Sequence, residues 1–477
     1  MKRTKIVCTI GPASDKKNIL KKLVQNGMNV ARLNFSHNVH KYHLQVIKNV
    51  RAIARELGQP IAILQDLQGP RIRLGDLPEK GIELKAGKQI TLTTYKGIQQ
   101  EKIPVTYEKM HEDVKAGERI LIADGLIQVN VLEVKGQNII CKVINGGKIT
   151  SHKGINLPDT SVSVPAVSGK DKDDLLFGVK NRVDFVALSF VRTAKDVYDL
   201  KYLIQKYQQK LKIKEKQPIK VIVKIERREA IENIDEIIEA TDAVMVARGD
   251  LGIELPAEDV PLMQKMIIDK CLAAAKPVIV ATQMLESMII NPRPTRAEVS
   301  DVANAVIDHT DAVMLSGETA SGKYPAVAVE YMKKIIEKTE KSTYDDLVLQ
   351  EKVKKIVPTS DAVSSVAKML AEHVKAKLIL AASLSGYSGR IVSRYRPELP
   401  ILVACDNERT ERQLNLSWGI IPFVLPRCDS IEELLDRSVG YLKKNKYLFK
   451  EDKIIIVAGE PVGRSGNVNL VEIKTIN

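Results

Sequence analysis

The chain has 477 residues, of which 44% are hydrophobic and 28% charged, and these proportions exclude wholesale disorder. Lys and Arg number 73 against 59 Asp and Glu, so the formal net charge of +14 favours an anionic partner. Aromatic residues make up only 4%, which argues against a single-stranded nucleic-acid binder, because such proteins stack bases on aromatic rings.

The basic excess is concentrated at the start of the chain, where residues 1–69 carry 12 Lys or Arg and 3 Asp or Glu. No run of five or more like charges occurs there, so we do not expect a disordered basic arm. Charge alone leaves three kinds of partner open: nucleic acid, an acidic membrane surface and a phosphorylated small molecule.

The five cysteines are odd in number and widely scattered: Cys8, Cys141, Cys271, Cys405 and Cys428. They contain no CxxC pair, which argues against a disulfide framework or a zinc knuckle and favours a reducing compartment. No apolar run is long enough to span a membrane, and the start of the chain lacks a secretory signal. We therefore expect a soluble, cytoplasmic protein with no membrane partner.

Eight short β-branched runs alternate with helical patterns, which is typical of β/α units around a parallel sheet. The runs lie at 6–10, 29–33, 61–64, 185–188, 221–225, 243–246, 278–281 and 312–315. The helical patterns lie at about 15–26, 39–57, 171–181, 195–210, 228–240, 257–275, 295–308 and 326–341. Eight such units predict a closed (β/α)8 TIM barrel. The rival Rossmann sheet is disfavoured because the first turn, Gly11-Pro12-Ala13-Ser14, has no GxGxxG pattern.

Two segments depart from this alternation and predict further domains. Residues 70–165 are rich in β-formers and Gly-containing turns, which indicates an all-β domain inserted in a barrel made of 1–69 and 166–342. The polar stretch 341–357 predicts a linker helix. Residues 358–477 then show a separate α/β pattern, with strands near 378–380, 401–403 and 454–457, and the expected C-terminal domain is 343–477. The expected fold class is therefore α/β, with a TIM barrel, an inserted β domain and a C-terminal α/β domain.

Polar side chains follow nearly every predicted barrel strand, at the end where such barrels build their active sites. Lys224 and Glu226 stand two apart on one strand and share a face, although alone they would also suit an ordinary ion pair. Asp250, one strand later, adds a second carboxylate. Two carboxylates, with water and phosphate oxygens filling the other positions, are how proteins hold Mg²⁺. A lysine beside that cation suits an anion whose charge grows in the transition state.

Other polar residues have weaker signals of their own. Gly249 can present its backbone N–H to a carboxylate or phosphate, although Arg-Gly-Asp also fits a simple turn. Arg32 and Arg73 are candidate phosphate clamps, although a lone Arg is more often solvated at the surface. His37 is as well suited to capping or packing as to catalysis.

Six segments, in order, resemble signature segments of the pyruvate kinase family: 31–37 (ARLNFSH), 224–226 (KIE), 247–252 (ARGDLG), 281–288 (ATQMLESM), 294–298 (PTRAE) and 315–320 (LSGETA). Within the insertion, 124–127 (DGLI) and 153–158 (KGINLP) resemble the family's lid, a small β-barrel. The resemblance implies transfer of the phosphoryl group of phosphoenolpyruvate to ADP. The products are ATP and, after ketonisation of the enolate, pyruvate, in the last step of glycolysis.

The resemblance also implies roles for individual residues. Mg²⁺ (or Mn²⁺) is held by Glu226 and Asp250, and the residues that bind or act on the substrate are Arg32, Lys224, Gly249, Asp250 and Thr282. Among these, Lys224, Arg32 and Thr282 are the catalytic candidates. The residues that the resemblance implies for nucleotide binding are Asn34, His37, Arg73 and Lys153.

The family's K⁺ site matches Asn34, Ser36, Asp66 and the backbone carbonyl of Leu67. This chain departs from potassium-requiring members at Leu67, Gln68, Arg71 and Leu74, and it resembles the potassium-independent branch, which has Lys where Arg71 stands. We therefore expect activity without K⁺, with the Arg71 guanidinium in place of the missing charge. An Arg71 that points to solvent, with K⁺ still used, is the alternative.

A serine- and glycine-rich turn at 383–390 resembles the family's effector pocket for sugar phosphates, and 461–466 resembles the loop beside it. Ser383, Ser385, Gly386 and Ser388 are the implied effector-binding residues, in a regulatory C-terminal domain. An ordinary helix-capping turn is the plainer interpretation. The family also implies a homotetramer.

Two other functions are weighed against this one. One is a different Mg²⁺ barrel enzyme acting on enolpyruvate, such as a carboxylyase or mutase, which the lid and the third domain disfavour. The other is a basic nucleic-acid-binding or scaffold protein without catalysis, which the intact residues at the strand ends disfavour. We therefore expect no nucleic-acid partner.

Overall fold

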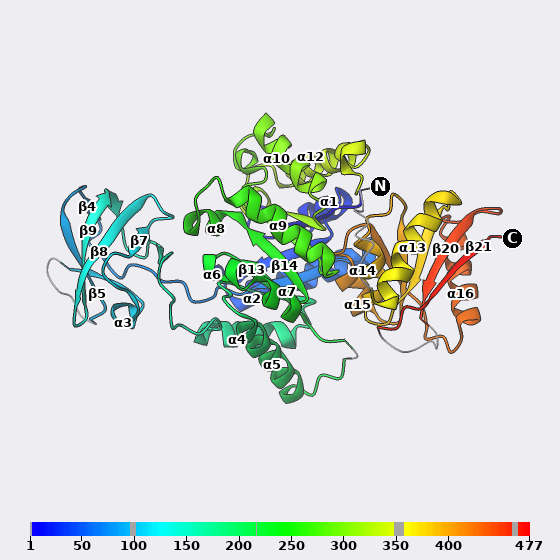
Figure 1. Ribbon diagram of the computed structural model, residues 1–477, viewed down its shortest axis with the longest axis horizontal. Helices are drawn as coiled ribbons and strands as arrows, with labels where there is room; N and C mark the ends of the chain where they lie inside the picture. Colours follow the sequence, from blue (N-terminus) through cyan, green and yellow to red (C-terminus); the bar gives the residue numbers. More distant parts are fainter. Residues whose placement is uncertain (1, 96–101, 216, 348–356, 460–465) are drawn as a thin grey trace.

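The computed structural model describes residues 2–95, 102–215, 217–347, 357–459 and 466–477. Figure 1 shows three parts along the long axis: a small group of β-strands at one end, a barrel with helices around it in the centre, and a second sheet with helices at the other end.

The central part is a closed barrel of eight parallel strands, which confirms the predicted TIM barrel. Its strands are β1 (Lys5–Thr9), β2 (Val30–Asn34), β3 (Ala62–Asp66), β12 (Phe185–Leu188), β13 (Lys220–Ile225), β14 (Ala243–Ala247), β15 (Val278–Ala281) and β16 (Ala312–Leu315). They close in the order β1-β16-β15-β14-β13-β12-β3-β2. All their carboxyl ends therefore meet at one mouth.

The helices lie close to their predicted positions and surround the barrel (Figure 1). They are α1 (Lys17–Gln25), α2 (His40–Leu57), α4 (Gly169–Lys180), α5 (Ala194–Lys210), α6 (Arg228–Glu232), α7 (Ile234–Ala240), α9 (Val260–Ala273), α10 (Arg296–Ile307) and α12 (Pro325–Thr339). The single helix expected over 228–240 is in fact α6 and α7, separated at Asn233. The short helices α8 (Arg248–Glu254), η1 (Glu286–Ile289) and α11 (Gly317–Ala320) were not predicted.

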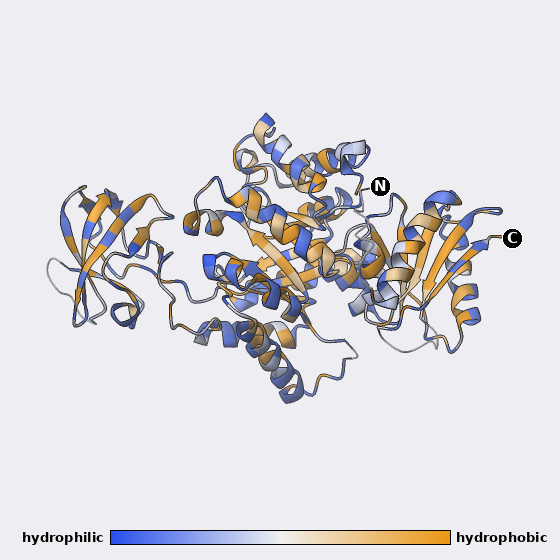
Figure 2. Ribbon diagram, in the orientation of Figure 1, coloured by the Kyte–Doolittle hydropathy of each residue, from blue (hydrophilic) through white to orange (hydrophobic). Residues whose placement is uncertain are grey.

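Side chains of the barrel strands alternate between two buried layers. Val221 and Val223 belong to the large core between sheet and helices, whereas Ile222 belongs to the smaller core inside the barrel. Both faces are therefore apolar, as the orange strands in Figure 2 show. The inner core also contains Leu416, from the C-terminal part of the chain, which closes the barrel at the end opposite the mouth.

The described residues of the insertion after β3 form strands and one short helix, α3 (Met110–Asp113). A six-stranded sheet contains β11 (Ile155–Asn156), β7 (Arg119–Ile122), β8 (Ile127–Lys135), β9 (Asn138–Asn145), β5 (Gln89–Thr93) and β6 (Ile103–Pro104), in that order. A second sheet pairs β10 (Gly147–Ile149) with β4 (Ile82–Leu84). Residues 72–75 lie between the two edges of the six-stranded sheet: the Ile155 N–H donates to the Ile72 carbonyl at 2.9 Å, and the Gly75 N–H donates to the Pro104 carbonyl at 2.7 Å. Isolated bridges join Arg73 to Gly154 and Leu74 to Val105. The β-barrel expected for 70–165 stays a prediction.

The C-terminal part is a five-stranded sheet in the order β19-β18-β17-β20-β21, with β21 antiparallel. Its elements are α13 (Thr359–His373), β17 (Leu378–Ala382), α14 (Tyr387–Ser393), β18 (Ile401–Cys405), α15 (Glu408–Leu414), β19 (Ile420–Val424), α16 (Ile431–Lys444), β20 (Lys453–Ala458) and β21 (Leu470–Thr475). The sequence interpretation missed β19 and β21, the two edge strands. β19 contains Pro422, and β21 alternates charged with apolar residues. Neither segment therefore has the continuous apolar sequence that predicts a buried strand.

The linker helix expected over 341–357 is wrong for the described part of that range, residues 341–347 and 357. These residues contain only the short 3-10 helix η2 (Thr343–Asp345). Residues 348–356 lie outside the described residues. Over the described ranges, no helix has both the length and the apolar character that a membrane crossing requires.

Candidate active site

Four charged side chains meet at the barrel mouth, and each comes from the end of a strand. Arg32 donates from Nε to Asp66 Oδ2 at 2.7 Å. The Lys224 Nζ lies 2.7 Å from Glu226 Oε1 and 3.6 Å from Asp66 Oδ1. All four are nearly inaccessible to water, with exposed fractions of 9% or less. Two basic and two acidic side chains therefore pair in a buried cluster.

Burial sets the protonation of this cluster together with the neighbouring charges. It raises the pKa of Glu226 to about 7; Lys224 opposes the shift and the charge of Asp250 adds to it. Burial alone would raise the pKa of Asp66, but Lys224 and Arg32 outweigh it and hold that pKa below its ordinary value. Burial alone would lower the pKa of Lys224, but Asp66 and Glu226 raise it. Lys224 therefore stays charged at neutral pH.

The Arg-Gly-Asp segment is the first turn of α8, not a simple turn. The Gly249 N–H donates to Thr282 Oγ1 at 2.8 Å, and a Cβ on Gly249 would lie 3.3 Å from that oxygen. Thr282 and Gln283 both have positive φ, at 70° and 53°. Arg248 donates from Nη2 to the Thr282 carbonyl at 2.8 Å, which helps to hold this strained backbone in place. The structure thus places Gly249 next to Thr282.

The oxygen donors at the mouth suit a hard divalent cation. Asp250 is near enough to Glu226 for its charge to raise the Glu226 pKa, and both groups are carboxylates. In the part of the chain that the structure describes, no three His, Cys, Asp or Glu side chains are grouped to hold a metal ion by themselves. Two protein carboxylates plus substrate and water oxygens match the way Mg²⁺ is bound.

The predicted nucleotide residues fall into two pairs. Asn34 and His37 lie on the barrel rim, where Asn34 Oδ1 accepts from the Ser36 N–H at 3.1 Å and His37 is exposed. Arg73 and Lys153 lie in the insertion. The Arg73 guanidinium donates to the His152 carbonyl at 2.9 Å, and Lys153 is exposed.

The oxygens predicted to hold K⁺ lie beside the charged cluster. Asp66 Oδ1 is buried and makes no hydrogen bond within the described residues; the Lys224 ammonium lies 3.6 Å away. The Leu67 carbonyl accepts a hydrogen bond from Ser189 Oγ at 2.8 Å. Arg71 is exposed, so its guanidinium is not buried among these oxygens.

Three residues at this mouth were not selected from the sequence. Ser189 accepts from Lys224 Nζ at 3.0 Å, and the Phe190 N–H donates to Glu226 Oε2 at 2.7 Å. Lys170 donates to the Phe35 carbonyl at 2.7 Å, next to the K⁺ ligand candidates. Ser189 and Phe190 follow β12 directly, so their place at a strand end was the available signal.

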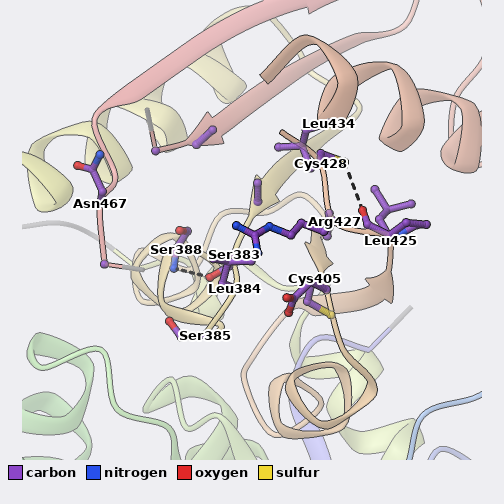
Figure 3. A pocket seen from close by; sticks show the side chains of 17 residues that line it. Ser383, Leu384, Ser385, Ser388, Cys405, Leu425, Arg427, Cys428, Leu434 and Asn467 are labelled. Atoms are coloured by element: carbon purple, nitrogen blue, oxygen red, sulfur yellow. Dashed lines mark hydrogen bonds between the residues drawn. The ribbon is translucent and has the colours of Figure 1, made fainter. Parts of the chain in front are cut away.

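The serine-rich turn of the C-terminal part lines a pocket of about 70 Å³ (Figure 3). Ser383, Ser385 and Ser388 line it together with Arg427, and the Ser388 N–H donates to Ser383 Oγ at 3.2 Å. Gly386 is not among the residues that line this pocket; it directly precedes α14, with φ at +80°. Residues 461–465 of the neighbouring loop lie outside the described residues.

Comparisons with known proteins identify the same family in both the N-terminal and the C-terminal parts of the chain. A family model for the pyruvate kinase barrel domain matches residues 1–329, and one for the pyruvate kinase alpha/beta domain matches residues 361–474. The pyruvate kinase of Sporosarcina psychrophila is 44% identical, over 100% of this chain and 81% of the relative. That of Clostridium acetobutylicum is 41% identical over 100% of both chains. A crystal structure of a pyruvate kinase from Cryptosporidium parvum has a TM-score of 0.91 at 37% identity, covering 100% of this chain and 96% of that one. The chain belongs to the pyruvate kinase family.

Proposed function

We propose that the barrel mouth transfers the phosphoryl group of phosphoenolpyruvate to ADP, giving ATP and pyruvate in the last step of glycolysis. The observation that carries this proposal is the buried lysine Lys224, charged and flanked by Glu226 and Asp66. Phosphoryl transfer needs positioning and charge neutralisation more than covalent help from the protein. The enzyme is thus a phosphotransferase.

Glu226 and Asp250 are the residues that would hold Mg²⁺ or Mn²⁺. When bound, the cation neutralises charge on the substrate carboxylate, the phosphoryl group and the enol oxygen. Lys224 supplies a second, fixed positive charge, which stabilises the moving phosphoryl group and the enolate oxygen left behind. Its burial strengthens this effect, because water cannot screen the charge.

Three further groups orient the substrate in this proposal. Arg32 binds the phosphate, with its guanidinium already fixed by Asp66 and by Thr9 Oγ1 at 2.8 Å. Gly249 and Thr282 line the pocket for the substrate carboxylate. The fixed Arg32 costs little entropy when the substrate binds, because its rotamer is set in advance.

The nucleotide is assigned to Asn34, His37, Arg73 and Lys153. In this assignment 70–165 is a lid, which brings Arg73 and Lys153 over the barrel residues when it closes on ADP. The division into a catalytic barrel (1–69 and 166–342), a lid (70–165) and a regulatory domain (343–477) follows from the same proposal.

The monovalent cation site is assigned to Asn34, Ser36, Asp66 and Leu67, and we propose that the reaction proceeds without K⁺. The sequence departures at Leu67, Gln68, Arg71 and Leu74 support this. The exposed Arg71 must then act after lid closure, because it is not buried beside the site. Activation by K⁺ over tetramethylammonium at fixed ionic strength would refute potassium independence.

A phosphorylated effector is assigned to the pocket at Ser383, Ser385, Gly386 and Ser388, where serine hydroxyls and Arg427 offer hydrogen bonds and charge to an anion. Saturation curves with and without fructose 1,6-bisphosphate, ribose 5-phosphate and AMP test this assignment. A cytoplasmic homotetramer that binds neither nucleic acid nor membrane completes the proposal.

A coupled assay for pyruvate tests the function itself. We expect pyruvate and ATP in equal amounts from phosphoenolpyruvate and ADP, with no pyruvate when ADP is left out. Pyruvate release without ADP, or a different product from phosphoenolpyruvate, would favour the carboxylyase or mutase alternative. No turnover at all, together with binding to nucleic acid, would favour the scaffold alternative.

A further inference from the structure

Among the residues that the structure describes, Ser189 is the one uncharged side chain that accepts a hydrogen bond from the Lys224 ammonium. Three groups contact that ammonium: Glu226 Oε1 at 2.7 Å, Ser189 Oγ at 3.0 Å and Asp66 Oδ1 at 3.6 Å. Ser189 is 2% exposed, so no bulk water competes for its hydroxyl. Its contact with Lys224 has no part in the function proposed above.

The orientation of the Ser189 hydroxyl is fixed by its two partners. The Leu67 carbonyl can only accept, so the single hydroxyl proton points to it across 2.8 Å. The Lys224 ammonium can only donate, so it takes a lone pair of the same oxygen. The hydroxyl is therefore held as an acceptor toward the lysine.

Several hydrogen bonds hold the backbone around Ser189. The Leu67 N–H donates to the Ala187 carbonyl at 3.2 Å, so two hydrogen bonds join the ends of β3 and β12. The next residue, Phe190, donates its N–H to Glu226 Oε2. Gly69, with φ at +71°, permits this close approach, since a Cβ there would lie 3.0 Å from the Ser189 Cβ. One short turn thus contacts both Lys224 and Glu226.

We propose that Ser189 is a positioning residue that keeps the Lys224 ammonium aimed at the reacting phosphoryl group when Glu226 turns toward a divalent cation. The inference rests on the proposed function. A cation at Glu226 weakens the Lys224–Glu226 ion pair, and Ser189 is then the nearest of the remaining partners. Because it is neutral, Ser189 holds the lysine without cancelling its charge, which a carboxylate cannot do.

The test compares Ser189→Ala with the conservative Ser189→Thr, which keeps the hydroxyl. We expect Ser189→Ala to lower kcat about tenfold with KM for phosphoenolpyruvate within about twofold, because the lost hydrogen bond to a charged group serves the transition state. Ser189→Thr should keep at least about half of the wild-type kcat. Calorimetric titration with oxalate, a planar dianion like the enolate, should show about tenfold weaker binding to Ser189→Ala than to the wild type.

Ser364→Ala is the matched control, since Ser364 is also buried and donates to the Ser360 carbonyl at 2.8 Å within α13. It should leave kcat and oxalate binding unchanged. Wild-type kcat in Ser189→Ala, or equal losses in the Ala and Thr variants, would overturn the inference. A wild-type chain that forms no pyruvate would instead refute the proposed function, so the two failures are distinguishable.

Discussion

The Glu226 carboxyl should make metal binding depend on pH near neutrality. Burial raises its pKa to about 7, with Lys224 opposing and Asp250 adding to the shift. With a pKa of about 7, the carboxyl is mostly protonated below pH 7 and mostly charged above it. Only the charged form is a good metal ligand, so protons and the metal ion compete for Glu226.

The size of the effect follows from that pKa. For a pKa of about 7, roughly one metal-free molecule in eleven would have a charged Glu226 at pH 6, against roughly ten in eleven at pH 8. The apparent affinity for Mn²⁺ should therefore be about tenfold weaker at pH 6 than at pH 8. This ratio corresponds to about 1.4 kcal/mol of binding free energy.

Electron paramagnetic resonance of free Mn²⁺, titrated against enzyme without substrate, measures this ratio directly. Glu226→Gln should bind more weakly at both pH values and lose the tenfold ratio. Glu229→Gln is the matched control: Glu229 accepts from Ser161 Oγ and should keep the ratio. Equal affinity of the wild type at pH 6 and pH 8 would refute the reasoning, because it would place the Glu226 pKa well below 6.

Three further substitutions test other parts of the molecule. Lys224→Gln should lower kcat at least about 100-fold with little change in KM, and a smaller loss in initial-rate assays would contradict its role in charge stabilisation. Leu416→Ala should lower the unfolding free energy by about 3 kcal/mol, because it leaves a cavity in the barrel interior; an unchanged thermal midpoint would show that Leu416 does not close the barrel. Gly386→Ala should abolish any effector response while basal kcat is unchanged, since φ is +80° and a Cβ would lie 2.9 Å from Leu414 Cδ2; full activation by the same sugar phosphate would contradict it.

Most of the barrel strands were predictable because the pattern that indicates each strand lies within a few neighbouring residues. Runs such as 278–281 and 312–315 are short, apolar and β-branched, and the structure has strands at those residues. The edge strands β19 and β21 were missed, since a strand at an edge need not be apolar on both faces. The split of the 228–240 helix at Asn233 was missed as well, because a helical period continues across the break.

The sequence allowed the charged residues at the barrel mouth to be selected as candidates. Lys224 and Glu226 stand at the end of a strand, and their spacing of two predicted that they would share a face; the structure joins them in an ion pair. The sequence around Ser189 gave no such signal, because a serine after a strand is common. Its role depends on which side chain it contacts in the folded protein. That partner, Lys224, is 35 residues away in the chain.

The sequence by itself determined the order of the β/α units and the residue types at the strand ends, because periodicity and strand-end position are properties of neighbouring residues. Only the tertiary structure decided how those ends face one another. Burial raises the Glu226 pKa to about 7, the hydrogen bond from Gly249 to Thr282 joins residues 33 positions apart, and Leu416 of the C-terminal part closes the barrel. Burial and close contact create these properties, and they exist only once the barrel has closed and the C-terminal part has packed against it.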